Sequence, residues 1–544
     1  MLTTQMTMAE ALQQVAEARP DQEALVCGDV RLTYRRLAAA AQALAFGLWQ
    51  HGIRKGDRVA ALLPPGPEFA CLFFALAQLG GVMVPLNPQL RRQTLSAILK
   101  DAEPIMLVSA IPLNDEIVAE TPGLRHLVQV PPAHGFGIAW QSLFAAPAED
   151  RPSLPEVLPT DLLALLYTSG TTGTPKGSMH THRSLIAPVM ASIKLRELWL
   201  GRPNLEKLGR MFKALVRYRE RLLRAAGQPQ TMLSTTGWQN TTGLEVMLQA
   251  LLMGDRLVVM PRFHPREALR LVQEERVTIL IAVPTAYQVM LALPDFDRYD
   301  LSSLLICGTG AAPCPPQLAR EMQRRFGCAV HIGFGATETG GGIAATSLDD
   351  SDRVQAETVG RPMPGMEIKI VDDQRREVPR GQVGELACRS DSLMLGYYRA
   401  PEATAQVLDD EGWYYTGDLA WQDEEGYLHI VGRKRDIIIR GGQNIYPAEI
   451  EAFLMAHPKI QEAAVVGVPL GFGGESAWAF VIAAPGAELT PQEVLDYCRS
   501  HLEPYKIPAV VRIVPDFPRA EGGKPQKFVL RAMALRETEG GGPP

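Results

Sequence analysis

The sequence predicts an α/β protein: a large N-terminal domain of parallel-rich sheets wrapped by helices, followed by a small mobile C-terminal α+β domain. Between about residues 25 and 283, short runs rich in Val, Leu and Ile alternate with longer amphipathic stretches, which is typical of parallel sheets covered by helices. After about Gly432 the segments become shorter and more mixed. The chain has 544 residues, whereas a single core stops growing at roughly 250 to 300, so at least two domains are expected.

In the large domain, the expected strands are apolar runs of five to seven residues bounded by polar or turn-forming residues. They include Val59–Leu63, Leu162–Tyr167, Arg256–Met260 and Val277–Val283. In the small domain we expect a strand at Ile437–Ile439, a helix after Pro447, and strands at Ala463–Val468 and Ala477–Ala483. The predicted boundaries are residues 1–432 for the large domain, 433–536 for the small domain and 537–544 for a disordered tail, because GGGPP has little to bury.

Composition and charge exclude several classes of protein. The chain is 46% hydrophobic and 21% charged, which fits a protein with ample apolar surface to bury. A formal net charge of −6 gives no basic footprint for nucleic acid. The N-terminus lacks the basic start and apolar run of a signal peptide, and no run approaches the roughly 20 apolar residues that span a bilayer. A cytoplasmic location without nucleic-acid partners is therefore expected.

The seven cysteines are scattered and form no C-x-x-C pair, so the sequence predicts neither a disulfide framework nor a zinc site.

A basic amphipathic segment at residues 195–227 stands apart from the rest of the pattern. It carries nine Lys or Arg against three Glu, with apolar residues at helical spacing. Two interpretations remain open. The segment is either a lid that touches membrane lipid or a partner, or a surface insertion that packs its apolar face on the body of the protein. We favour the insertion.

The strongest chemical signal is YTSGTTGTPKG at Tyr167–Gly177, directly after an apolar strand. Its glycines let the backbone turn with N–H groups facing inward, its hydroxyls add donors, and Lys176 adds a cation, so the segment can cradle a triphosphate. It does not fit a Walker P-loop, which needs G-x-x-x-x-G-K followed by Ser or Thr, because Gly170 and Gly173 are too close and Gly177 follows the lysine. A Walker-type ATPase or kinase is disfavoured.

Six further motifs follow in order. They are GTGAAP at Gly308–Pro313, GFGATE at Gly333–Glu338, YTGD at Tyr415–Asp418, GRKRD at Gly432–Asp436 with RGGQN at Arg440–Asn444, and GGK at Gly522–Lys524. Together with Tyr167–Gly177 they closely resemble the acyl-adenylate-forming superfamily, which contains acyl-CoA synthetases, firefly luciferases and nonribosomal peptide synthetase adenylation domains. The resemblance covers nearly the whole chain and is closest to an acyl-CoA synthetase.

The resemblance assigns a role to each of these stretches. It implies Lys524, Glu338 and Thr337 as catalytic residues, with Glu338 also holding Mg²⁺, and Arg435 as the domain hinge. The implied nucleotide-binding residues are Thr168, Ser169, Gly170, Thr171, Thr172, Gly173, Lys176, Gly308, Gly310, Ala311, Phe334, Gly335, Asp418 and Arg433. The implied CoA-binding residues are Gly441, Gly442 and Gln443, and the implied acyl pocket is Trp238, Asn240, Gly243, Gly308, Gly340 and Gly341.

Some positions depart from the family pattern. Phe334 stands where Tyr is usual, and stacking on adenine needs only the aromatic face. Arg435 replaces the usual Asp or Lys of the hinge, and the residues around Lys524 also differ, with Ala520, Gly522 and Pro525 nearby. Nucleotide binding and domain rotation are still expected.

The implied reaction joins an acid to a thiol in two steps. The carboxylate attacks the α-phosphate of ATP and releases pyrophosphate, and the thiol of coenzyme A then releases AMP from the acyl-adenylate. The family rotates its small domain between the steps. The stretch Thr236–Gly243 contains no Asp that would hold an amino acid, and Gly340–Gly342 leave room for a large group, so a fatty or other apolar acid is expected.

Three alternatives remain open. An adenylation enzyme would load an aryl or other acid onto a separate carrier-protein thiol. A luciferase-like oxygenase would consume oxygen. A non-catalytic nucleotide-binding or membrane-docking module would need none of the catalytic positions. A homodimer is a further open question.

Overall fold

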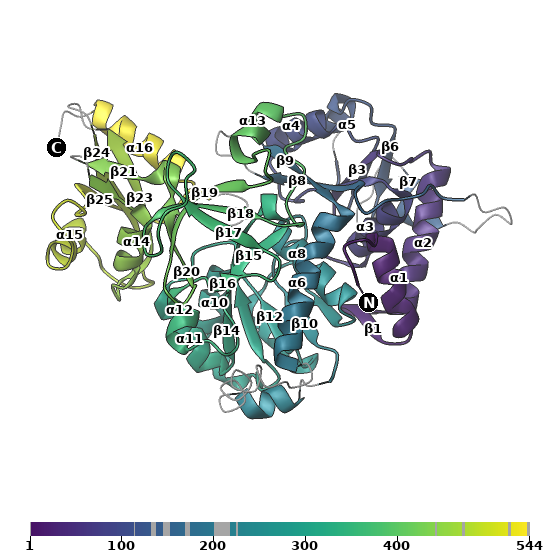
Figure 1. Cartoon of the computed structure of the whole chain (residues 1–544), viewed down its shortest axis with the longest axis horizontal. Helices are drawn as coiled ribbons and strands as arrows, with labels where there is room; N and C mark the ends of the chain where they lie inside the picture. The colour runs from purple at the N-terminus through teal and green to yellow at the C-terminus, as the bar shows by residue number, and fades with distance from the viewer. Residues whose placement is uncertain are drawn as a thin grey trace.

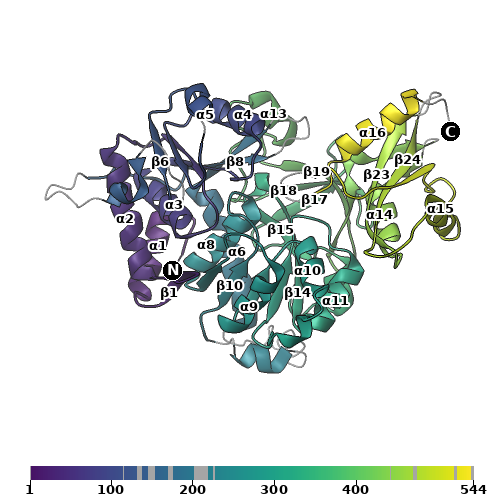
Figure 2. The ribbon, with the colours of Figure 1, turned by 180° about the vertical axis from the view of Figure 1, so that it is seen from behind.

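The computed structural model describes residues 2–113, 115–131, 138–144, 153–168, 175–200, 218–224, 227–440, 443–469, 474–519 and 524–540. Figure 1 shows a large body that holds the N-terminus and a smaller unit at one end that holds the C-terminus. The same separation is visible from behind (Figure 2). This arrangement confirms the predicted fold class.

Two parallel-rich sheets build the large body. In the first the order is β16 (Arg361–Pro362), β15 (Gly341–Ala345), β14 (Ala329–Ala336), β13 (Ile306–Thr309), β12 (Ile279–Ile281), β10 (Thr231–Ser234), β11 (Arg256–Val259), β1 (Glu23–Cys27) and β2 (Val30–Thr33). In the second it is β7 (Ile138–Ala139), β6 (His126–Gln129), β5 (Met106–Ser109), β3 (Arg58–Leu62), β4 (Val82–Pro85), β8 (Leu162–Thr168) and β9 (Lys176–Thr181). Antiparallel pairs occur only at the ends of each order, among the described residues.

Helices cover these sheets and fill the space between them. They are α1 (Met8–Ala18), α2 (Tyr34–Gln50), α3 (Pro67–Leu79), α4 (Arg92–Ala102), α5 (Asp115–Glu120), α6 (His182–Leu200), α8 (Thr241–Leu252), α9 (Pro265–Glu274), α10 (Pro284–Leu291), α11 (Pro316–Phe326), α12 (Asp352–Glu357) and α13 (Pro401–Val407). Short 3-10 turns lie at Trp140–Phe144, Phe296–Arg298, Thr337–Thr339 and Lys434–Asp436. Helix α3 is apolar on nearly all sides and almost wholly buried, as expected for a helix inside a core.

An antiparallel sheet of four strands links the body to the small unit. Its order is β17 (Glu367–Val371), β18 (Gly384–Arg389), β19 (Tyr414–Gln422) and β20 (Leu428–Arg433). The small unit then contains β21 (Ile438–Arg440), β22 (Gln443–Ile445), α14 (Pro447–Met455), β23 (Ile460–Pro469), β24 (Glu475–Ala483), α15 (Pro491–Arg499), β25 (Val510–Ile513) and α16 (Lys527–Gly540). Its core is separate from the cores of the body.

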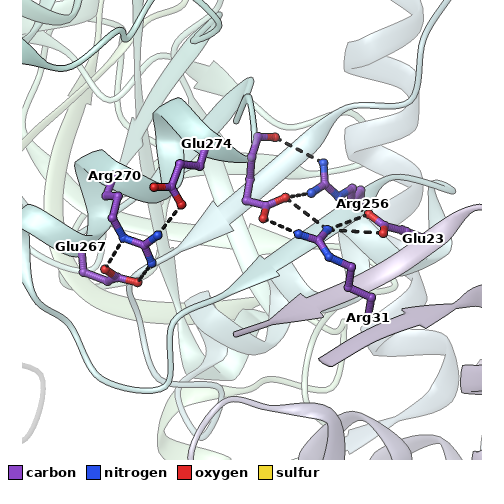
Figure 3. A network of polar contacts seen from close by, with 7 residues as sticks. Glu23, Arg31, Arg256, Glu267, Arg270 and Glu274 are labelled. Atoms are coloured by element: carbon purple, nitrogen blue, oxygen red, sulfur yellow. Dashed lines mark hydrogen bonds and ion pairs between the residues drawn. The ribbon is translucent and has the colours of Figure 1, made fainter. Parts of the chain in front are cut away.

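An ion-pair network joins the edge of the first sheet to the end of α9 (Figure 3). Arg31 of β2 lies 2.7 Å from Glu275 and 3.2 Å from Glu23, and Arg256 of β11 bridges the same two carboxylates. Beside this network, Arg270 pairs with Glu267 and Glu274 along α9. Isolated surface pairs contribute little, but shared carboxylates in a network hold the β1–β2 hairpin in register with β11.

Several expected boundaries need correction. Strand β12 spans only Ile279–Ile281 of the predicted Val277–Val283, and helix α16 runs to Gly540, so the predicted tail begins too early. Residues 541–544 lie outside the described part of the chain. No helix among the described residues is long and apolar enough to cross a membrane.

The basic segment 195–227 is described only in part. Helix α6 extends into it as far as Leu200, and residues 218–224 form another helical stretch. Tyr218 and Leu222 of that stretch are buried against Leu305, Ala329 and Leu348 of the body. These contacts are those of a packed insertion.

Candidate active site

The strand hairpin β8–β9 brings the two ends of the predicted phosphate loop together. Thr168 lies opposite Lys176, and Tyr167 lies opposite Gly177. The intervening Ser169, Gly170, Thr171, Thr172 and Gly173 lie outside the described residues. The Nζ atom of Lys176 lies 5.3 Å from the ring centroid of Tyr397, and the N–H of Tyr398 donates to the Gly177 carbonyl at 2.7 Å. The loop therefore starts and ends beside the segment that contains Tyr397.

Glu338 occupies a tight turn between β14 and β15. Thr339 fixes this turn because its Oγ1 accepts from the Ala336 N–H at 3.1 Å and donates to the Gly341 carbonyl at 2.6 Å. Gly340 completes the reversal with a φ of 64°, and a Cβ there would lie 2.7 Å from the Ser392 carbonyl. The turn tolerates only glycine at that point.

Tyr397 orients the Glu338 carboxylate. Its hydroxyl donates to Oε1 at 2.7 Å, while the N–H of Met394 donates to the Glu338 carbonyl at 2.8 Å. Burial and the neighbouring carboxylate raise the pKa of Tyr397, so its hydroxyl keeps its proton at neutral pH. The second carboxylate oxygen of Glu338 accepts no hydrogen bond from the residues that the structure describes.

Asp418 and Arg433 face one another across β19 and β20. They are register partners, and Nε of Arg433 lies 2.6 Å from Oδ1 of Asp418. Asp418 is buried, with 5% of its surface exposed. Burial raises the pKa of its carboxyl group, and the positive charge of Arg433 opposes that rise. The pair holds a buried carboxylate of β19 against the partly exposed side chain of Arg433, the last residue of β20.

Lys524 reaches this place from the small unit. Lys524 is exposed to solvent, but the surrounding protein desolvates its ammonium group and so lowers its pKa. The positive charge of Arg433 lowers this pKa further, and the negative charge of Asp418 raises it. Glu338, Lys524 and Arg435 all act electrostatically on the Asp418 carboxyl group. The structure thus brings together Glu338, Asp418, Arg433, Arg435 and Lys524 from separate parts of the sequence.

The predicted adenine-side residues lie at the ends of two adjacent parallel strands. Gly308 lies within β13, opposite His331 of β14, and Gly310 follows this strand. A Cβ on Gly310 would meet the Gly333 carbonyl at 2.9 Å, so the loop runs close against β14. Ala311 has a φ of 63°, an uncommon conformation for alanine that occurs often at ligand sites. Phe334 packs beside the apolar cluster that contains Tyr397 and Tyr414, and Gly335 follows it on β14.

The predicted acyl-pocket residues fall into two groups. Trp238 is buried in the core with its ring edge-on to Phe69 at 5.5 Å, Asn240 is the exposed residue before α8, and Gly243 lets the helix approach the Gly237 carbonyl. Gly340 and Gly341 instead lie beside the Glu338 turn. The sequence did not reveal which side chain faces these glycines.

The predicted CoA-binding residues are described only in part. Gln443 is exposed on β22, whereas Gly441 and Gly442 lie outside the described residues. Arg435, the predicted hinge residue, is exposed in the 3-10 turn Lys434–Asp436. The neighbouring Lys434 lies 2.9 Å from Asp373 and 3.0 Å from Glu385. Lys434 therefore ties the segment after β20 to the body.

His180 on β9 lies close to the Thr337 backbone but carries no charge at neutral pH. Burial lowers the pKa of its imidazole to about 4, and its Nε2 lies 3.0 Å from the Ser178 hydroxyl. This histidine supports the turn and does not supply an acid or base.

Sequence reasoning missed two residues of this region. Tyr397 lies in the loop Leu393–Tyr398, where nothing in the sequence links it to Glu338. Glu245 lies in α8, and its signal was available: it is a charged residue in an otherwise apolar helical run. Its carboxyl group reaches Gly341.

Comparison with known proteins decides the family. The AMP-binding enzyme family matches residues 12–398, and the AMP-binding enzyme C-terminal domain matches residues 449–524.

The chain belongs to the AMP-binding enzyme family.

Three relatives show the range of this AMP-binding enzyme's neighbours. A medium-chain fatty-acid–CoA ligase of Escherichia coli is 34% identical, over 97% of this chain and 91% of the relative. A feruloyl-CoA synthase of Amycolatopsis is 35% identical, over 95% of this chain and 96% of the relative. The solved structure of the anthranilate CoA ligase AuaEII with anthranoyl-AMP matches with a TM-score of 0.85 and 26% identity, over 99% of each chain. This AMP-binding enzyme is an AMP-forming acid–thiol ligase of the acyl-CoA synthetase type.

Proposed function

We propose that the enzyme activates a carboxylic acid with a largely apolar body, such as a fatty acid, as an acyl-adenylate and transfers the acyl group to coenzyme A. Pyrophosphate leaves in the first step and AMP in the second. One observation supports the proposal: Glu338 and Lys524, from two distant stretches of chain, both act electrostatically on the carboxyl group of Asp418, which lies in a third. Segments far apart in sequence converge in this way when they hold one ligand.

In the first step, the proposed role of the protein is positioning and charge stabilisation. Phe334 offers its ring to the adenine, the Asp418 carboxylate accepts from the ribose hydroxyls, and Lys176 with the loop between β8 and β9 binds the phosphates. Arg433 orients Asp418 at 2.6 Å and adds a positive charge. Lys524 offsets the negative charge that grows as the acid carboxylate approaches the α-phosphate.

The residues present fit a Mg²⁺ ion bound together with ATP. Mg²⁺ prefers oxygen ligands and is usually held by one or two carboxylates plus substrate phosphates. Glu338 offers one oriented carboxylate whose second oxygen is free of hydrogen bonds from the described residues. Among the residues that the structure describes, no cluster of three His, Cys, Asp or Glu side chains could hold a metal without the nucleotide. When bound, the ion neutralises charge on the phosphates, and Tyr397 keeps Glu338 aimed at it.

In the second step, we assign the wall of the thiol channel to Gly441, Gly442 and Gln443. This step requires the small unit to turn, because Lys524 now lies beside Asp418. The tie between Lys434 and Glu385 at 3.0 Å fixes the chain just before the turning point, so Arg435 is the proposed hinge.

The identity of the acid is the least constrained element. The names of the relatives include a medium-chain fatty-acid ligase, a feruloyl-CoA synthase and an anthranilate ligase, so family membership alone does not select among aliphatic and aryl acids. The stretch Thr236–Gly243 contains no Asp that would hold the ammonium group of an amino acid, which supports an acid with an apolar body.

Hydroxylamine trapping across a panel of acids tests the proposal. The purified enzyme is incubated with ATP, Mg²⁺ and aliphatic acids of 4 to 18 carbons (about the natural range) or aryl acids, with and without CoA. The expected result is acyl-hydroxamate without CoA and acyl-CoA with AMP when CoA is present. If the adenylate forms but no acyl-CoA appears, and a holo carrier protein is acylated instead, the acceptor is a carrier-protein thiol and not CoA. No trapped adenylate from any acid would refute the proposed activity.

A further inference from the structure

Helix α8 carries a polar stripe that faces protein. Thr241, Glu245 and Gln249 are spaced four residues apart and therefore share one face of the helix. The remaining faces are lined by buried residues such as Leu244, Met247, Leu248 and Leu251. Polar residues inside a core helix are costly unless they are satisfied or needed.

Strand β15 lies against this stripe. A Cβ built on Gly341 would lie 2.8 Å from Cδ of Glu245 and within 3.0 Å of both carboxylate oxygens. The backbone N–H of Gly342 and the side-chain amide of Gln249, at 2.9 Å, donate to the same carboxyl group. The glycine at position 341 is therefore what makes room for the carboxyl group.

The Glu245 carboxyl group lacks a cationic partner among the described residues. Burial raises its pKa to about 7, and only the Gly342 and Gln249 hydrogen bonds oppose that rise. The residue is nevertheless half-buried and keeps part of its surface accessible. A carboxyl group that is crowded by protein, uncompensated in charge and still accessible has capacity for another hydrogen bond.

A second polar atom on the stripe is unsatisfied. The Thr241 hydroxyl lies one turn before Glu245, and its Oγ1 is buried with no hydrogen-bond partner, while the residue is 9% exposed. Buried polar groups are normally paired, so the unpaired Thr241 hydroxyl, one turn from the Glu245 carboxyl group, indicates a missing polar partner. That partner is absent from the described protein atoms.

The stripe lies next to the nucleotide site. Gly341 and Gly342 are register partners of Ala336 and Gly335 on β14, directly before the turn that holds Glu338. A molecule that extends from this turn along β15 meets Glu245. We place the body of the acid along this path, beside the predicted acyl-pocket residues Gly340 and Gly341.

We propose that Glu245 receives a hydrogen-bond donor, a hydroxyl or amino group, carried on the apolar body of the acid. The inference rests on the proposed ligase activity and narrows its substrate class from apolar acids in general to acids that carry such a donor. Desolvation of Glu245 by a plain hydrocarbon chain is unfavourable, whereas a donor restores the lost interaction. Sites built to bond a substrate hydroxyl can discriminate strongly against the analogue that lacks it.

Matched pairs of acids test the proposal. Each pair contains a parent acid and the same acid with one hydroxyl or amino group: straight-chain acids with and without a chain hydroxyl, and benzoic and cinnamic acids with and without a ring hydroxyl or amine. Pyrophosphate release gives kcat/KM for each member in the wild type, Glu245→Gln and Glu245→Leu. Glu274→Gln, on the surface of α9 and paired with Arg270 alone among the described residues, is the matched control.

The wild type should prefer the substituted member of at least one pair by about tenfold or more. Glu245→Leu should reverse that preference, Glu245→Gln should leave an intermediate ratio, and Glu274→Gln should match the wild type. A wild-type ratio of kcat/KM values near one in every pair overturns the proposal. This outcome is read from the wild type alone and does not depend on whether a variant folds. A preference that survives Glu245→Leu also overturns it. Failure of the proposed ligase activity itself gives a different result, because then neither member of any pair releases pyrophosphate.

Discussion

The hydroxyl of Tyr397 lies 2.7 Å from Oε1 of Glu338, although 58 residues separate them and the two belong to different segments of the body. The Nζ atom of Lys176, at the end of the predicted phosphate loop, lies 5.3 Å from the centroid of the same tyrosine ring. One side chain thus links the expected phosphate-binding strand to the expected metal-binding carboxylate. The bond should set the direction of the free carboxylate oxygen.

Tyr397→Phe should raise the Mg²⁺ concentration needed for half-maximal adenylate formation by about three- to tenfold, because one hydrogen bond to a charged group is worth roughly 1.5 to 3 kcal/mol and only part of that reaches the metal. The measurement is a Mg²⁺ titration of pyrophosphate release, with MgATP binding by calorimetry as a second readout. Tyr427→Phe, which removes a hydroxyl that donates to Asp350 at 2.7 Å and lies outside the motifs assigned to the site, is the control. An unchanged Mg²⁺ requirement would show that Glu338 needs no such support.

Asp418→Asn should weaken ATP binding by about ten- to a hundredfold, because the ribose hydroxyls lose a charged acceptor and Arg433 loses its partner. The dissociation constant of ATP is measured by calorimetry in the absence of acid. Asp372→Asn, on the exposed turn after β17, should bind ATP like the wild type. Equal affinity in Asp418→Asn would remove Asp418 from the nucleotide site.

Glu245 should make the folded protein less stable as pH rises. Burial raises the pKa of its carboxyl group from 4.5 to about 7, so the native state holds the proton more tightly than the unfolded chain. The favourable contribution is complete below pH 4.5 and is lost as pH rises through 7, and it amounts to at most about 3 kcal/mol. Relative to wild type, the melting temperature of Glu245→Gln should increase between pH 5 and pH 8. Glu274→Gln should give a melting temperature that changes with pH in parallel with the wild type. A parallel change in Glu245→Gln would contradict the raised pKa of Glu245.

The sequence predicted the class of fold, and it named the charged residues that the structure brings together around Asp418. The strand at Leu162–Tyr167 followed from its unbroken apolar run. Asp418 and Lys524 followed from the resemblance of two short motifs, YTGD and GGK, to the acyl-adenylate-forming superfamily. Tyr397 could not be predicted, because its importance depends on a contact with Glu338 that only the folded chain creates. The orientation of Glu245 toward Gly341 similarly depends on how α8 packs on β15.

Other predictions from the sequence stay untested. The assignments of Gly170, Gly173, Gly441 and Gly442 fall on residues outside the described part of the chain. The choice of CoA over a carrier thiol, the domain boundary at residue 432, the cytoplasmic location and the homodimer also remain predictions. The packing of Tyr218 and Leu222 on the body supports the surface insertion without testing contact with a membrane.

The central claim is that Lys524, beside Asp418, acts in adenylate formation. Measuring the two half-reactions separately in Lys524→Ala tests this claim most directly. Lys459→Ala, an exposed lysine of the same unit paired with Glu493, serves as control. Adenylate formation from acid and ATP should fall by about a hundredfold or more in Lys524→Ala, while thioester formation from supplied acyl-adenylate and CoA should change by less than about threefold. Equal loss of both half-reactions, or retention of both, would contradict the role of Lys524 beside Asp418.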